Sequence, residues 1–252
     1  MLSKNGLVIV CAGKDTLKAS IYDIQLLQLC ISVGKCMSLN RLYIPAKTKG
    51  DILGISDIGI TDGDINFCVK SILYEVRKGE FKGIFADFER DNEEVLSLLS
   101  KLDEMAYKEN IEFYAPICNQ KAVKYGFLVA QSALSGGNLE DYILELDEKY
   151  KDRIAVSIRP ICTDFVLPSQ DSEGTPISQQ EKQEKMQKYD AGAYFSRELC
   201  AKYFTYMDEN EQGHFVLFDD LDTISAKIQR LNNLPVKKIF ALYPDIEKLL
   251  AN

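Results

Sequence analysis

Two carboxylate side chains stand two residues apart at the end of a short apolar run, Lys82–Glu89. On a β-strand alternate residues share a face, so Asp87 and Glu89 would point the same way as Phe85. A second carboxylate close by raises the pKa of one member of the pair, which suits a general acid. The spacing therefore predicts acid–base chemistry. The alternative is a pair of strand-end acids that bind Arg90 or a neighbouring cation.

Eight short apolar runs, one of them holding this pair, alternate with segments of helical period. They span residues 7–12, 41–44, 57–61, 83–89, 111–116, 126–131, 154–159 and 238–243. Strands that alternate with helices favour a closed parallel sheet, and 252 residues suit a single (β/α)₈ (TIM) barrel of the α/β class. Active sites of such barrels lie at the C-terminal ends of the strands, where Asp87 and Glu89 would stand on strand four.

Several of the intervening helices are indicated by their first residues. Asp91 and Glu94 form a capping-box pattern after strand four, and Asn138 is a candidate N-cap after two glycines. A further helix is expected after Asp222, and another over residues 21–33, which are apolar on a broad face. Residues 178–188 predict a helix that is polar nearly all round.

The segment between the seventh and eighth runs is too long for a plain crossover. Within it, residues 203–206 and 214–218 flank a loop that contains Asp, Asn and Gly, which predicts a β-hairpin. We expect a small α+β insertion on the barrel rim at about residues 189–220, between strand seven and the last helix, with residues 1–252 forming one domain.

The run around the carboxylate pair resembles the signature of the family-18 glycoside hydrolases. That family carries Asp-Gly-x-x-x-Asp-x-Glu, with one more internal Asp, on the fourth barrel strand. This sequence keeps Gly83, Asp87 and Glu89, while Lys82 and Phe85 occupy the positions of the other two aspartates.

A second, longer block resembles the rim insertion of the same family. It comprises Tyr203–Asn210, His214–Asp220 and Ile224–Lys227. In the family a Tyr-containing strand, a hairpin turn, an aromatic-Asp-Asp and a Ser-x-x-Lys helix follow one another. The spore and peptidoglycan branch of the family shows this pattern most clearly. The resemblance spans about residue 55 to the C-terminus.

The resemblance implies a retaining, substrate-assisted hydrolysis of glycans that contain N-acetylglucosamine, either chitin-like or peptidoglycan. Glu89 would protonate the leaving oxygen and then activate water. Asp87 would orient the acetamido group and stabilise the oxazolinium ion. No cofactor and no metal is expected.

Three departures from the family pattern leave a second interpretation open. Phe85 replaces the internal aspartate, and Gln131 stands on strand six where the family has a tyrosine that holds the acetamide. The chain has no Trp for the sugar-stacking position on strand eight, where Leu242 or Tyr243 stands. Tyr243 offers a smaller stacking face. The alternative to the hydrolase is a glycan-binding or spore-coat scaffold barrel that has lost catalysis.

Other side chains are candidates for lining a glycan groove. Asn119, Arg159 and Asp164 lie at or near expected strand ends, and Tyr206 could be a sugar platform. Each has a plainer alternative as a solvated loop residue, a local ion pair or a packing residue. His214 is the only histidine, so a Cys/His zinc site has little support, and a partly buried aromatic role is expected for it.

Composition excludes several classes of function. The net charge of −8 and the absence of a Lys/Arg cluster argue against nucleic-acid binding. No stretch of about 18 apolar residues predicts a membrane span, and the N-terminal apolar run is too short for a signal peptide. Seven cysteines without close pairing favour a reducing compartment, so the protein is expected in the cytoplasm or with the spore. The sequence gives no indication of oligomeric state.

A weaker alternative is phosphate binding. Ser135-Gly136-Gly137 precedes a predicted helix and resembles a backbone nest for an anion, but no lysine follows at P-loop spacing. A plain tight turn explains the same residues.

Overall fold

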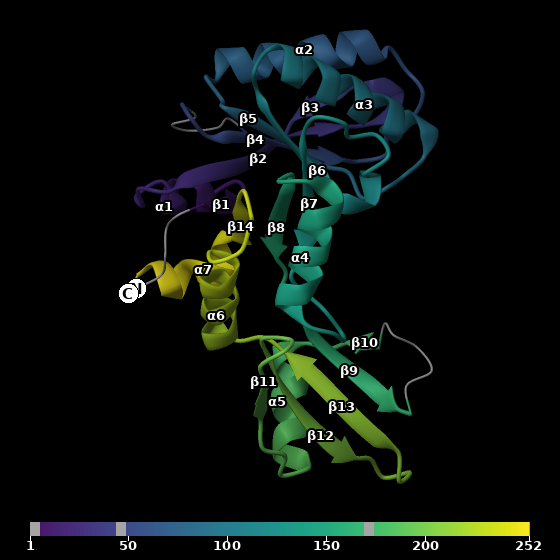
Figure 1. Ribbon diagram of the computed structural model, residues 1–252, viewed down its shortest axis with the longest axis vertical. Helices are drawn as coiled ribbons and strands as arrows, with labels where there is room; N and C mark the ends of the chain where they lie inside the picture. Colours follow the sequence, from purple (N-terminus) through teal and green to yellow (C-terminus); the bar gives the residue numbers. More distant parts are fainter. Residues whose placement is uncertain (1–5, 44–48, 169–173, 252) are drawn as a thin grey trace.

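The computed structural model describes residues 6–43, 49–168 and 174–251, and its main feature is a closed barrel of eight parallel strands (Figure 1). The ring closes because the first strand pairs with both the second and the last. In order around the barrel the strands are β1 (Leu7–Cys11), β2 (Gln25–Val33), β4 (Ile52–Asp57), β5 (Gly83–Asp87), β6 (Glu112–Pro116), β7 (Phe127–Gln131), β8 (Ile154–Ile158) and β14 (Ile239–Leu242). The predicted (β/α)₈ fold is confirmed.

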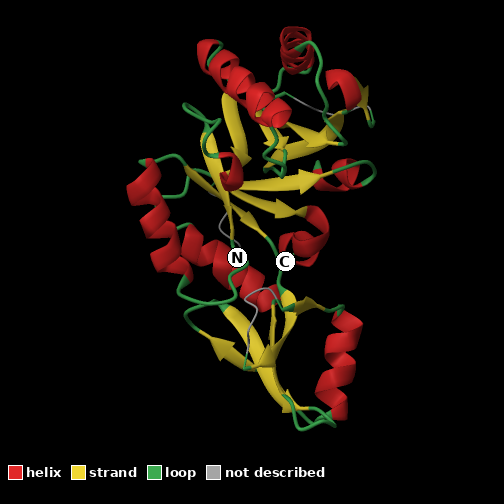
Figure 2. Ribbon diagram, turned by 90° about the vertical axis from the view of Figure 1, so that its right-hand side faces the viewer, coloured by secondary structure: helices red, strands yellow, loops and turns green. Residues whose placement is uncertain are grey.

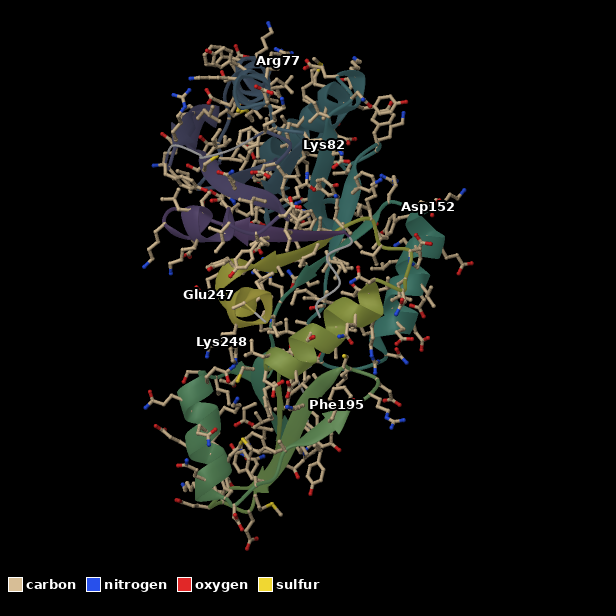
Figure 3. The ribbon with its side chains drawn as sticks, turned by 90° about the vertical axis from the view of Figure 1, so that its left-hand side faces the viewer. Arg77, Lys82, Asp152, Phe195, Glu247 and Lys248 are labelled. Atoms are coloured by element: carbon tan, nitrogen blue, oxygen red, sulfur yellow. The ribbon has the colours of Figure 1, made fainter. Side chains whose placement is uncertain are left out.

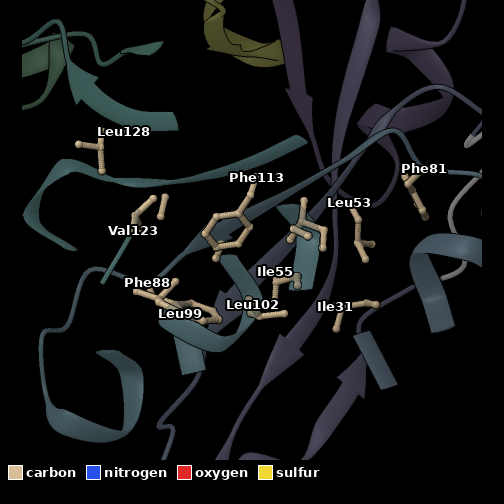
Figure 4. Packing of buried hydrophobic residues seen from close by; sticks show 14 of the residues in the cluster. Ile31, Leu53, Ile55, Phe81, Phe88, Leu99, Leu102, Phe113, Val123 and Leu128 are labelled. Atoms are coloured by element: carbon tan, nitrogen blue, oxygen red, sulfur yellow. The ribbon is translucent and has the colours of Figure 1, made fainter. Parts of the chain in front are cut away.

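Two hydrophobic layers follow from the alternation of side chains along these strands. Residues that point into the barrel, among them Phe85, Tyr114 and Phe240, pack around its axis. Residues that point outward, such as Ile84 and Phe88, join the larger cluster between the strands and the helices, part of which is seen in Figure 4. The inward pattern predicted for residues 83–89 therefore holds through Asp87.

The ring of helices around the barrel is incomplete. The barrel helices are α1 (Asp15–Ala19), α2 (Ile65–Lys78), α3 (Glu93–Lys108), α4 (Leu139–Tyr150), α6 (Leu221–Leu231) and α7 (Tyr243–Leu250). Among the described residues, β2 and β4 are joined only through η1 (Lys35–Met37) and β3 (Leu39–Arg41), which is antiparallel to β2. A single 3₁₀ turn, η2 (Ile117–Asn119), lies between β6 and β7. None of the helices described is long and apolar enough to cross a membrane.

The second and third barrel strands differ from the prediction. The expected helix over residues 21–33 is largely strand β2, and the third strand is β4 rather than residues 57–61. The predicted strand 41–44 overlaps β3 only at Arg41, and Ile44 lies outside the described residues. A strand buried on both faces carries apolar residues without alternation, so periodicity cannot separate it from a buried helix.

The predicted helices after strands four and six are present. In α3 the residues Val95, Leu98, Leu99, Leu102 and Ala106 are all buried, as expected from their spacing. Its N-cap is Asn92, so the predicted capping box of Asp91 and Glu94 does not form.

The caps of the two later helices follow the pattern more closely. Asn138 caps α4, since its side chain accepts a hydrogen bond from the backbone N–H of Glu140 at 2.9 Å. Helix α6 begins at Leu221, with Asp220 and Thr223 forming a capping box, and so starts just before Asp222.

A separate antiparallel sheet hangs below the barrel in Figure 1. Its strands, in spatial order, are β10 (Thr175–Pro176), β9 (Cys162–Leu167), β13 (Gly213–Phe218), β12 (Ala201–Met207) and β11 (Tyr194–Ser196). The predicted hairpin is confirmed as β12 and β13. In Figure 3 the labelled Phe195 lies in this insertion, well away from Lys82 on the barrel.

One helix, α5 (Gln179–Lys188), lies along one side of this sheet (Figure 2). None of its residues is buried, as its polar sequence predicted. Two of its lysines contact the sheet: the Nζ of Lys182 lies 4.3 Å from the centre of the Phe218 ring, and that of Lys185 lies 5.1 Å from the Tyr206 ring. Met186 also packs against the aromatic cluster of the sheet. Lys185 also lies 3.2 Å from a carboxylate oxygen of Asp164.

Candidate active site

The predicted carboxylate pair lies at the C-terminal mouth of the barrel. Asp87 is the last residue of β5, the fourth barrel strand, and is partly buried. Glu89 follows two residues later, beyond the end of the strand, and its side chain is 67% exposed. One carboxylate is therefore set into the mouth and the other stands above it in solvent.

Burial raises the pKa of Asp87 above its ordinary value. The positive charge of Arg159 opposes this shift, and the negative charge of Glu89 adds to it. Burial thus favours the protonated form of the Asp87 carboxyl, whereas the neighbouring guanidinium favours the ionised form.

Arg159 follows strand β8 directly and joins the two carboxylates. Its Nη2 lies 3.4 Å from Oε1 of Glu89, and its side chain lines the same small cavity as Asp87. The sequence pointed to Arg159 as a groove residue, and the structure does bring it to the pair.

Asp245, in the first turn of α7, is a further carboxyl in range of Arg159. Burial raises its pKa, and the charge of Arg159 opposes the shift. Sequence reasoning missed it. Its place three residues after β14, the last barrel strand, at the end of the barrel where catalytic groups gather, is the signal that could have found it.

A cavity of about 90 Å³ opens beside Asp87. Its apolar walls and its three polar residues come from five barrel strands and from the residue that follows β8: Val10, Leu27, Leu29, Phe85, Phe240 and Leu242, with Asp87, Ser157 and Arg159. Below it the barrel axis is filled by aromatic rings. Phe85 meets Phe240 edge-on at 5.0 Å, and Phe240 meets Tyr114 at 5.2 Å. The site is therefore shallow.

Asn119 is near the pair but does not line an open groove. It is fully buried at the end of η2, and its Nδ2 donates a hydrogen bond to the backbone carbonyl of Phe88. The side chain therefore contacts the chain immediately before Glu89, with no surface left for a sugar.

Gln131 and Tyr243 are placed differently from each other. Gln131 ends β7 with its side chain exposed at the mouth end of the barrel. Tyr243 is 3% exposed, belongs to the cluster between strands and helices, and donates its hydroxyl to Oε1 of Glu247 at 2.9 Å. Its ring is thus covered by packing and offers no face for stacking a sugar.

Asp164 and Tyr206 belong to a polar cluster inside the insertion. Oδ2 of Asp164 accepts a hydrogen bond from the Tyr206 hydroxyl at 2.7 Å, and its Oδ1 lies 2.9 Å from Nδ1 of His214. Burial works against ionisation of Asp164, but the bonds from Tyr206, His214 and Lys185 outweigh it and hold its pKa below the ordinary value. None of these contacts reaches Asp87, Glu89 or Arg159.

Two other predictions concern a metal ion and a phosphate group. Within the residues described, no group of three or more His, Cys, Asp or Glu side chains is arranged to hold a metal ion. Gly137 adopts a positive φ of 82°, which suits the tight turn before α4. The side chain of Asn138 accepts a hydrogen bond from the backbone N–H of Glu140, so that this N–H group is already bound. Phosphate binding at this turn stays a prediction.

Comparison with known proteins agrees with the geometry at the level of fold. No protein-family model matches the chain, and no curated protein matches it. Among solved structures, the Bacillus megaterium spore cortex-lytic enzyme SleL is similar, with a TM-score of 0.61 and 17% identity over 97% of this chain and 73% of that one.

Two chitinases are similar as well. The Chromobacterium violaceum enzyme has a TM-score of 0.62 and 12% identity, covering 94% of this chain and 93% of that one. The class V chitinase from Nicotiana tobaccum has a TM-score of 0.57 and 10% identity, covering 93% and 92%. The chain therefore has the barrel fold of chitinases and spore cortex-lytic enzymes, as the resemblance inferred from its sequence implied.

Proposed function

We propose that the protein is a glycoside hydrolase that cleaves glycans containing N-acetylglucosamine at the barrel mouth. The observation that carries the proposal is the position of Asp87 and Glu89 at the end of barrel strand four, beside a small cavity with apolar walls. About 90 Å³ has room for a few non-hydrogen atoms, as in an acetamido group, but not for a sugar ring. The ring would lie above, next to Glu89.

In this proposal the acetamido oxygen of the substrate replaces an enzyme nucleophile. It attacks the anomeric carbon while Glu89 gives its proton to the leaving oxygen, and an oxazolinium ion results. Glu89 then takes a proton from water as the water attacks that ion. Asp87 accepts the acetamido N–H, with the acetyl methyl against Phe85 and Phe240.

Arg159 is compatible with this cycle. Its contact with Glu89 is 3.4 Å long and both side chains are substantially exposed, so substrate can displace the pair at little cost in free energy. Beside Asp87, the same guanidinium favours the ionised carboxylate that an acetamido N–H requires.

Phe85 favours a second candidate, a glycan-binding barrel without catalysis. Its ring lies inside the barrel against Phe240, at the position where the family it resembles has an aspartate that shares charge with the catalytic pair. Asp87 would then bind an acetamido group without driving hydrolysis.

One experiment separates the candidates. Release of reducing ends from N-acetylchitooligosaccharide and from spore-cortex glycan is measured for wild type, Glu89→Gln and Glu80→Gln over about pH 4 to 8. Glu80 is a matched control, since it is an exposed glutamate whose surface ion pair with Lys49 is remote from the mouth. The hydrolase predicts turnover by wild type and Glu80→Gln, and a loss of most of it in Glu89→Gln.

Binding of the same glycans by calorimetry completes the test. If wild type binds but cleaves neither glycan, the binding barrel is correct and the hydrolase is wrong. If it neither binds nor cleaves, both candidates are wrong.

A further inference from the structure

Glu89 lies beyond the hydrogen-bonded part of its strand. On one side, β5 pairs with β6 only from Gly83 to Phe85. On the other side, its pairing with β4 ends at Asp87. A residue two positions past the last ladder contact is free to change its backbone direction unless other groups hold it.

On the β6 side, a side chain takes the place of the missing ladder partner. Asn119 sits at the end of η2, directly after β6, and its Nδ2 donates to the carbonyl oxygen of Phe88. The phenyl ring of Phe88 is itself packed in the outer cluster near Leu99 (Figure 4). Both the backbone and the side chain of the residue before Glu89 are therefore fixed.

On the β4 side, a second contact fixes the residue after Glu89. Asp57 ends β4, and its buried carboxylate receives two hydrogen bonds from the Arg90 guanidinium, one of them 2.6 Å long from Nε to Oδ2. The same carboxylate accepts the backbone N–H groups of Gly59 and Ile60 at 2.8 and 3.0 Å. Asp57 is thus a rigid anchor, and Arg90 is bound to it in a bidentate manner.

We propose that Asn119 and Asp57 are positioning residues that hold Glu89 from its two sides, one through Phe88 and the other through Arg90. The catalytic part of this inference rests on the function proposed above, but the restraint on the backbone does not. The buried Oδ1 of Asn119 has no hydrogen-bond partner among the described residues, which is unfavourable for stability. In the part of the chain that the structure describes, the bond to Phe88, the residue before Glu89, is the only hydrogen bond of the Asn119 side chain.

The test uses two variants and a matched control. Asn119→Leu keeps approximate volume but removes the donor to Phe88. Arg90→Gln removes the bidentate contact from the partly exposed side, so that the anchor Asp57 itself stays in place. Arg77→Gln is the control, because Arg77 forms the same bidentate pair with Glu109 at a distance from the mouth.

Two readouts are measured on the full chain: amide hydrogen exchange of residues 87–91, and kcat and KM on N-acetylchitooligosaccharide. We expect exchange at Asp87, where the ladder with β4 ends, to rise about tenfold or more in both variants and to stay unchanged in the control. Where wild type is active, kcat should fall by about 10- to 100-fold with KM changed by less than about twofold, since misplacement of a reacting group acts on the chemical step.

The outcomes distinguish this inference from the proposed function. Exchange and kcat at wild-type levels in Arg90→Gln and Asn119→Leu would overturn it. Faster exchange in both variants, together with a wild type that cleaves nothing, would support the restraint and reject the hydrolase. If Asn119→Leu does not fold, Arg90→Gln alone decides, because Arg90 lies at the surface and Asp57 keeps its bonds from the backbone N–H groups of Gly59 and Ile60.

Discussion

Lys227 and Asp219 form a buried ion pair, with Nζ of Lys227 2.6 Å from Oδ2 of Asp219 and almost no exposed surface on either side chain. The pair lies where the insertion rejoins the barrel. Asp219 also accepts the backbone N–H of Ile161 at 2.9 Å, so the beginning and the end of the insertion meet at one carboxylate. The Asp219-Asp220 pair and the segment Ile224–Lys227 of the sequence thus have a structural reason to occur together.

Removal of the lysine from this pair should be strongly destabilising. Lys227→Met leaves a buried carboxylate without its counter-charge, and a loss of about 3–5 kcal/mol in the free energy of unfolding is expected. Chemical denaturation measures it. Lys188→Met is the control, because its partner Glu209 is exposed and such pairs contribute about 0–1 kcal/mol. Equal losses in the two variants would show that the buried pair is not a structural joint.

Asp87 should make stability depend on pH in a definite direction. Its pKa is raised in the folded protein, so folding favours the protonated carboxyl. The resulting penalty is absent below the pKa of the unfolded chain and appears as the pH rises through the raised folded value.

Asp87→Asn, which has no charge to desolvate, should therefore be more stable than wild type at pH 7. The difference should vanish on acidification to about pH 3, below the ordinary Asp pKa. Urea denaturation at both pH values measures it. A difference that does not change with pH would contradict the burial of an ionised Asp87 as its cause.

Asp164 should make stability depend on pH in the direction opposite to that of Asp87. Its pKa is lowered, so its contribution to stability is complete above the unfolded pKa and is lost as the pH falls through the folded value. Asp164→Asn should lose about 1–3 kcal/mol at pH 7, because buried hydrogen-bond partners are left less well satisfied. Thermal unfolding between about pH 3 and 7 should also show a weaker acid dependence than in wild type. If the acid dependence is the same as in wild type, the loss of stability at low pH comes from other carboxylates.

Arg159 should control the titration of both half-buried carboxyls at the mouth. Its positive charge opposes the upward shift of the Asp87 and Asp245 pKa values. Arg159→Met should therefore raise both values further, and Arg159→Lys should preserve most of the wild-type behaviour because the charge remains. Carboxyl ¹³C chemical shifts followed across pH measure this directly. A pKa of Asp245 that does not respond would place it outside the site.

Strand four and its carboxylates could be predicted because the alternation of side chains and the position of the acidic residues indicated the same strand. Gly83 begins the run, apolar residues alternate with Phe85 and Asp87, and the strand ends where the carboxylates begin. Strand two could not be predicted, since Gln25–Val33 is apolar on both faces and a bulge near Cys30 interrupts what alternation remains. Where both faces of an element are buried, the pattern of apolar residues no longer shows whether the element is a strand or a helix.

Some of the site residues could be placed from the sequence, and others could not. Arg159 was identified because a strand end fixes which way its side chain points. Asn119 and Tyr243 follow β6 and β14 in the chain, yet one is buried against Phe88 and the other among the outer helices. The directions of these two side chains depend on how the 3₁₀ turn η2 and the first turn of α7 pack against the barrel. The residues next to them in the sequence do not determine that packing.

Helix α5 shows how a helix without an apolar stripe can still be attached to a sheet. Its charged contacts are ammonium groups over the rings of Phe218 and Tyr206, together with the ion pair from Lys185 to Asp164. Met186 and the C-cap residue Tyr189 add a small apolar contact with the same aromatic cluster. Attraction of this kind is screened by dissolved ions, whereas burial of aliphatic side chains is not. The attachment of this helix therefore depends in part on ionic strength, and raised salt should loosen its lysine contacts while the packing of Met186 and Tyr189 remains.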